Sequence, residues 1–154
     1  MKRRTLLKGA LAASAVGMAI GAGLLTPRMV LAAWPKDAFE AKSVDAAVSG
    51  LFGAGQHAGN DKIQLKVPDI AENGAVVPVS VEVEMAGVES ISILAEKNAS
   101  PLTSAFTLGA GAEPFVATRI KLGQTTNVIA VVKVGDKLYS ATKEVKVTIG
   151  GCGG

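Results

Sequence analysis

The feature that most constrains this chain is an alternation of apolar and polar residues with a period of two, which recurs between residues 62 and 149. Val79, Val81 and Val83 alternate with polar side chains, as on a strand with one buried face. Segments of similar apolar character are 62–67, 91–93, 116–122, 128–132, 138–139 and 145–149. About seven short strands separated by turn signals predict an all-β fold, an immunoglobulin-like antiparallel β-sandwich.

Two of these segments predict more than a strand. Residues 128–132 are apolar throughout, so we expect a central strand that is buried on both faces. The pair Gly135-Asp136 precedes residues 138–139 and suits a two-residue hairpin turn. The final strand is expected to run to about Ile149, directly before the last five residues.

One helix is predicted ahead of the strands, over residues 37–52. Asp37 and Glu40 have the spacing of a capping box, and Gly53 suits the C-terminal end. Apolar residues recur between them at helical spacing: Ala41, Val44, Val48, Leu51 and Phe52. The glycine-rich residues 53–61 predict a loop.

The N-terminus predicts an export signal. Lys2, Arg3 and Arg4 precede an Ala/Gly-rich apolar run over 9–25, and small or β-branched residues follow at 30–32. This order is typical of a twin-arginine signal, here residues 1–32, which sends a folded protein to the periplasm. The apolar run is short and contains Gly17, Gly21 and Gly23, so a membrane-spanning helix is disfavoured. Export in the folded state suggests a partner that travels with the chain.

The charge of the mature chain excludes one class of function. The full chain has a net charge of +3, but removing residues 1–32 leaves 11 Lys and Arg against 13 Asp and Glu, a net charge of −2. A nucleic-acid-binding protein needs a basic face, so that function is not expected. The remaining residues divide into a domain over 33–149 and an arm over 150–154.

The arm contains the only cysteine of the chain. Cys152 is surrounded by residues without side chains: Gly150, Gly151, Gly153 and Gly154. Such a segment is flexible and fits a narrow channel. In an oxidising compartment a lone cysteine is either free and reactive or paired with another molecule. The sequence therefore predicts a reactive sulfur on a swinging arm.

The surroundings of Cys152 favour a carrier over an enzyme. No Lys, Arg or His lies within five residues of it. An unperturbed thiol has a pKa of about 8.5 and is only a few per cent thiolate at pH 7. A partner's active site must therefore activate the sulfur.

His57, the only histidine, is assigned a structural or surface role. A single histidine without a nearby cluster of Cys or carboxylates is a poor metal site, so no metal and no cofactor are predicted. A catalytic pair with Cys152 would require the fold to bring the two residues together, and it is the disfavoured alternative.

Two other functions compete with a thiol carrier. Ubiquitin-like carriers also end in Gly-Gly and hold sulfur as a thiocarboxylate, which here would form on Gly154. That chemistry needs ATP, which an exported protein lacks. The second alternative is a non-catalytic immunoglobulin-like binding module with an incidental tail, or one that dimerises through a Cys152 disulfide.

Several segments resemble the SoxY family, the sulfur-carrier subunits of the periplasmic thiosulfate-oxidising Sox system. The most specific is the ending Val-Thr-Ile-Gly-Gly-Cys-Gly-Gly over 147–154, and others are 71–83, 95–98 and 117–120. The resemblance covers the signal and nearly all of the mature domain.

This resemblance implies a function and a set of partners. It implies that sulfur intermediates are held covalently on Cys152 and that the chain itself performs no turnover. The implied partners are a SoxZ-like subunit in a heterodimer, a SoxXA-like haem enzyme that joins thiosulfate to the thiol, and a SoxB-like hydrolase that releases sulfate. Further enzymes would oxidise the remaining sulfane sulfur.

Overall fold

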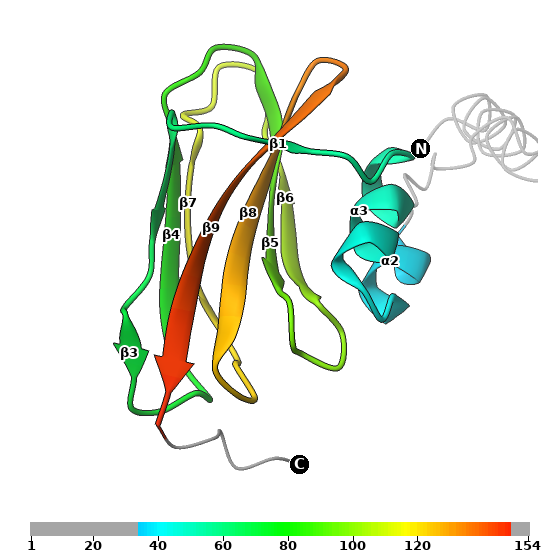
Figure 1. Ribbon diagram of the computed structural model, residues 1–154. Coiled ribbons are helices and arrows are strands. Elements are labelled where there is room, and N and C mark those ends of the chain that lie inside the picture. The colour runs from blue at the N-terminus through cyan, green and yellow to red at the C-terminus, as the bar shows by residue number, and fades with distance from the viewer. Residues whose placement is uncertain (1–33, 149–154) are drawn as a thin grey trace, which may run out of the picture. The chain divides into compact units, whose positions relative to one another are not determined.

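The computed structural model describes residues 34–148. The predicted export signal and the arm at 150–154 lie outside these residues. Within the described range, two helices precede nine strands (Figure 1). They are α2 (Lys36–Glu40), α3 (Val44–Phe52), β1 (Ala58–Gly59), β2 (Ile63–Lys66), β3 (Ile70–Ala71), β4 (Val77–Val83), β5 (Val88–Ala95), β6 (Leu102–Thr107), β7 (Phe115–Ile120), β8 (Thr126–Val134) and β9 (Lys137–Val147). Neither helix is long and apolar enough to cross a membrane.

The strands form two sheets. A six-stranded sheet has the order β1-β9-β8-β5-β6, with β3 also paired to β9, and a three-stranded sheet has the order β2-β4-β7. Pairing is antiparallel except for the short strands β1 and β3, which run parallel to β9. Alternate residues of β4 and β5 enter one shared core, including Val79, Val81, Ile91 and Ile93. The predicted β-sandwich is therefore confirmed.

The central strand expected at 128–132 is also confirmed. β8 lies between β9 and β5, and every residue from Val128 to Val132 is buried. Val128 and Val132 face the core between the sheets, whereas Ile129 and Val131 join a second cluster with the helices. A run without polar residues is needed here because both faces of β8 are covered.

The single helix predicted over 37–52 is wrong, because the chain breaks into α2 and α3. Ala41 and Ser43 have extended ψ angles of 147° and 157°. Ser43 is the N-cap of α3, and its hydroxyl accepts a hydrogen bond from the Ala46 amide at 3.2 Å. A serine that satisfies a free amide in this way starts a helix.

The N-terminal end of the helical region differs from the prediction, whereas the C-terminal end agrees with it. The predicted capping box is wrong: α2 begins after Pro35 without a side-chain cap, and Glu40 lies 3.7 Å from Lys36 in an exposed ion pair. Gly53 does end α3, with φ of 73° and its amide donating to the Ser49 carbonyl at 2.8 Å. Positive φ explains the glycine.

The predicted strand pattern needs three corrections. Segments 138–139 and 145–147 belong to one long strand, β9, which follows the predicted Gly135-Asp136 hairpin and ends at Val147. Ile149, the predicted end of the final strand, lies outside the described residues. The pattern missed β6, an edge strand in which polar and small residues outnumber apolar ones. The predicted loop 53–61 contains β1, a two-residue parallel contact with β9. Pairing partners distant in sequence, rather than local alternation, define these strands.

Candidate functional site

The candidate site is the C-terminal arm, and the structure describes the strand that carries it. Cys152 and the glycines at 150, 151, 153 and 154 lie outside residues 34–148. β9 ends at Val147, and the residue after it, Thr148, is the last one described. We use the term arm end for the end of the sandwich where β9 finishes, formed by Thr148, Ala71 and Thr125.

The base of the arm is held by a row of backbone donors. Lys146 N donates to the Asp69 carbonyl at 3.0 Å, and Thr148 N donates to the Ala71 carbonyl at 3.2 Å. Between them, Val147 N donates to Thr125 Oγ1 at 3.0 Å. These acceptors come from both sides of β9, so the strand is fixed up to four residues before Cys152.

A lysine adds a second anchor farther up the same strand. Lys143 Nζ lies 2.8 Å from Asp69 Oδ1 and donates to the Val67 carbonyl at 3.0 Å. The hydrogen bond from Lys143, followed by its positive charge, holds the pKa of the Asp69 carboxyl below its ordinary value. Both side chains remain partly in water, so this pair orients the segment before β3 more than it stabilises the fold.

His57 lies far along the strand from the arm. Its Nδ1 is 2.8 Å from the Ser140 hydroxyl, and the adjacent Ala58 pairs with Tyr139. Ser140 precedes Thr148 by eight residues, or about 26 Å along a strand. Four extended residues from Thr148 to Cys152 span about 14 Å at most. The fold therefore keeps His57 out of reach of Cys152 and gives it a structural role between β1 and β9.

Residues 34–148 contain no group of three or more His, Cys, Asp or Glu side chains placed to hold a metal ion. The ionisable side chains at the arm end are instead single or paired. Asp69 pairs with Lys143, and no ion pair is found for Glu72 or Lys146 within this range. The described part of the site therefore positions the arm.

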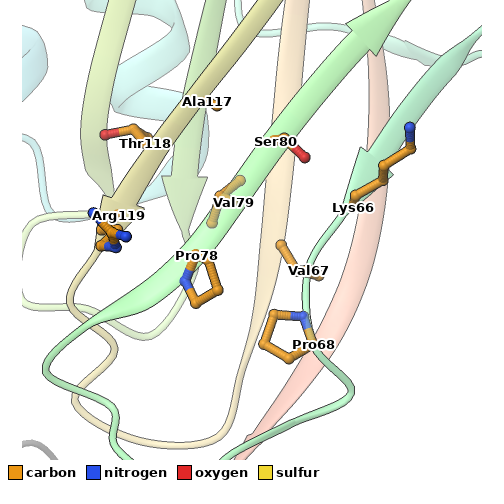
Figure 2. A pocket seen from close by; sticks show the side chains of 9 residues that line it. All are labelled: Lys66, Val67, Pro68, Pro78, Val79, Ser80, Ala117, Thr118 and Arg119. Atoms are coloured by element: carbon orange, nitrogen blue, oxygen red, sulfur yellow. The ribbon is translucent and has the colours of Figure 1, made fainter.

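A groove that the sequence pattern did not predict opens on the outer face of the three-stranded sheet (Figure 2). It has a volume of about 800 Å³ and lies where β2 leaves β4 after the pair Lys66 and Ser80. The residues that line it are Lys66, Val67, Pro68, Pro78, Val79, Ser80, Ala117, Thr118 and Arg119. In the sequence, the feature that could have indicated this groove is the pair of prolines Pro68 and Pro78.

Pro78 explains why the uncovered edge of β4 does not need a further strand. Amides of even-numbered β4 residues face β2, as shown by Glu84 N donating to the Lys62 carbonyl at 2.8 Å. Pro78 has no amide hydrogen on that side, where β2 has already ended. The edge is therefore blunted at this position. Lys66 Nζ lies 3.1 Å from Glu82 Oε2, and the Lys66 side chain extends away from Pro78 (Figure 2).

Comparison with known proteins decides the family. The family model described as "Sulfur oxidation protein SoxY" matches residues 48–152, which includes Cys152. The chain belongs to the SoxY family. A solved structure of the sulfur carrier protein SoxY from Chlorobium limicola f thiosulfatophilum is 40% identical, covers 70% of this chain and 97% of its own, and has a TM-score of 0.62.

Other similarities are weaker. A structure with the bacterial superantigen toxic shock syndrome toxin-1 is 9% identical, covering 55% of this chain and 99% of its own, with a TM-score of 0.38. An engineered protein is 15% identical, covering 65% of this chain and 23% of its own, with a TM-score of 0.39. Neither carries an argument about function. No curated protein matches the chain significantly.

One of the segments that resemble SoxY reaches the arm end, and another contacts the β7–β8 connection, which contributes Thr125 to that end. The segment 71–83 begins where the Ala71 carbonyl holds Thr148. The segment 95–98 contacts the β7–β8 connection, because Asn98 Nδ2 donates to the Lys121 carbonyl at 2.7 Å. Gly123 N donates back to Asn98 Oδ1 at 3.3 Å. The β7–β8 connection, which holds Val147 through Thr125, is thus itself held by Asn98 from the β5–β6 connection.

Proposed function

We propose that the chain is a covalent carrier of sulfur intermediates in thiosulfate oxidation, with Cys152 as the attachment point. The observation that carries this proposal is the position of the sole thiol: it lies within the SoxY match, among glycines, four residues beyond Thr148, whose amide is held by a hydrogen bond. A fixed base with a short flexible tip presents one atom to several active sites without moving the domain.

The loading step is an oxidation that needs an electron acceptor. The Cys152 thiol and thiosulfate combine to Cys–S–S–SO₃⁻, with release of one proton and two electrons. A SoxXA-like haem enzyme accepts the electrons. A SoxB-like hydrolase then adds water across the S–SO₃⁻ bond, which releases hydrogensulfate and leaves the persulfide Cys–S–SH. Further enzymes oxidise the remaining sulfane sulfur.

The division of labour follows from the surroundings of the thiol. No basic residue lies within five positions of Cys152, and the base of the arm keeps His57 out of reach. The partner enzymes therefore supply the positive charge that activates the sulfur. The carrier contributes the tether, which raises the effective concentration of the intermediate at each partner. It is not itself an enzyme and needs no cofactor.

The setting of this function is the periplasm. Residues 1–32 would direct the folded chain there by the twin-arginine route, together with a SoxZ-like subunit as a heterodimer. After cleavage, the mature chain would have no membrane segment and a net charge of −2.

The test is intact-protein mass spectrometry of the mature chain from thiosulfate-fed cells, before and after reduction. We expect reductant-sensitive thiosulfonate or sulfane adducts that map to Cys152, and complete loss of loading in Cys152→Ser with an unchanged fold. His57→Ala is the control and should load normally. A wild-type chain that shows only a free thiol or a symmetrical disulfide would contradict the proposal and favour a binding module.

A further inference from the structure

The shortness of the arm restricts where a partner enzyme sits on this carrier, if the proposed function holds. Thr148 is fixed by its hydrogen bond to Ala71, and Cys152 follows four residues later. Four extended residues span about 14 Å at most. If Cys152 enters an active site in the interior of an enzyme, much of that length lies within the channel that leads to the active site. Its surface around the channel mouth must therefore contact the arm end.

Two large apolar side chains are exposed at this end. Ile70 is 57% exposed and Val76 is 54% exposed. Ile70 pairs with Lys146 on β9, two residues before Thr148. Val76 directly precedes β4, in a connection that is tied to the β7–β8 turn by Leu122 N donating to the Gly74 carbonyl at 2.7 Å. Figure 1 shows the β3–β4 connection passing the end of β9.

The internal packing of the domain does not explain this exposure. Ala71 and Val77, the neighbours of these two residues, are buried in the core between the sheets. Ile70 and Val76 therefore face outward while the chain beside them faces inward. Beside Ile70, Asp69 and Glu72 in the sequence and Lys146 in the β3–β9 pairing supply polar side chains of both signs. Apolar side chains surrounded by a polar rim have the composition of a protein–protein contact.

We propose that Ile70 and Val76 form the docking contact for the enzyme that oxidatively joins thiosulfate to Cys152. The complementary surface on that enzyme is an apolar rim around the mouth of a narrow channel. Contact at the rim holds the carrier while the glycines on both sides of Cys152 let the sulfur enter. The free energy of binding then comes from contacts made by the rigid domain, and the arm itself needs no specific side-chain contacts.

The test is the double substitution Ile70→Ser with Val76→Ser in the mature carrier, purified with any subunit bound to it. Phe115→Ser is the matched control, since Phe115 is 50% exposed but lies five residues before Ile120, about 17 Å away at the other end of β7. Initial rates of thiosulfate-dependent mass gain on Cys152 are measured against carrier concentration with the purified loading enzyme. Alkylation of Cys152 by a small maleimide is measured in parallel.

We expect the double variant to raise the KM for the carrier on the order of tenfold, because apolar surface no longer leaves water on docking. The kcat and the maleimide rate should not change, and Phe115→Ser should match the wild type in all three measurements. An unchanged KM would overturn the docking contact. Slower alkylation would overturn it as well, because the substitutions would then have disturbed the arm itself.

Other outcomes distinguish this docking contact from a different role of Ile70 and Val76. If the double variant loses a co-purifying subunit on gel filtration, Ile70 and Val76 belong to a permanent interface and the proposal is wrong. If the wild-type carrier gains no mass at all, the proposed function fails and the docking contact fails with it. A wild type that loads and a double variant that loads equally well overturn the docking contact alone.

Discussion

The two sheets of the sandwich are covered to different extents. The six-stranded sheet is packed on both faces: the shared core fills one, and on the other Leu94, Ile129 and Val131 form a cluster with residues of α2 and α3. Among residues 34–148, the three-stranded sheet is packed on one face only, and β4 alternates buried valines with exposed or half-buried Pro78, Ser80 and Glu82. The same strand geometry therefore tolerates different residues, depending on whether a second layer covers it.

The helical layer depends on close backbone contact. A Cβ built on Gly50 of α3 would lie 3.0 Å from Ala38 Cα in α2, so these helices approach where a side chain would not fit. The outer face of the three-stranded sheet has no such cover among the described residues and holds the open groove instead.

Introducing a charge at equivalent serines should separate the sheets most clearly. Ser92 on β5 is 1% exposed and pairs with Val131 on the covered face, whereas Ser80 on β4 pairs with Lys66 on the uncovered face. Ser92→Asp buries a carboxylate without a partner and should lower the free energy of unfolding by several kcal/mol or prevent folding. Ser80→Asp should change it by less than about 0.5 kcal/mol. Urea unfolding of both variants measures this difference, and equal midpoints would refute it.

Truncating leucines compares, without charge, the helical layer with the edge of the shared core, against which Leu65 packs. Leu94 on β5 is fully buried among the helices and their sheet, and Leu65 on β2 is half-buried. Leu94→Ala should cost about 3 kcal/mol because it removes contacts and leaves a cavity. Leu65→Ala should cost about 1 kcal/mol because part of its surface is already in water. A larger loss for Leu65 in thermal or urea unfolding would mean that the helices contribute little to stability.

The smallest effect is expected at the edge where the two sheets meet, in the Asp69–Lys143 pair. Because the pKa of Asp69 is lowered in the folded chain, its contribution to stability is present above the ordinary value of 3.8 and is lost as the pH falls through the folded value. Asp69→Asn should therefore be slightly less stable than the wild type near neutral pH and equal to it in strong acid.

Unfolding midpoints from pH 2 to 7 measure this dependence. Glu72→Gln is the control, since Glu72 is an exposed carboxylate near the arm end for which no ion pair is found within residues 34–148. Near neutral pH it should have the same unfolding midpoint as the wild type. A difference between Asp69→Asn and the wild type that persists in strong acid would show that the aspartate acts through something other than its charge.

By itself the sequence determined the elements whose signals are local. Alternation predicted β4, the continuous apolar run predicted β8 between two layers, and Gly135 and Gly53 predicted a hairpin and a helix end. The attachment residue proposed for sulfur was also readable, because Cys152 is the only thiol. These features depend on residue type and spacing over a few positions.

The tertiary structure decided what depends on distant partners. β6 exists because β5 supplies its ladder, although polar and small residues outnumber apolar ones in it. β9 continues through its polar middle because β8 pairs with it over its length. The base of the arm is fixed because Asp69, Ala71 and Thr125, all remote in sequence, accept its last backbone donors. No local pattern encodes these bonds, because each acceptor is brought to β9 only by the closed sandwich.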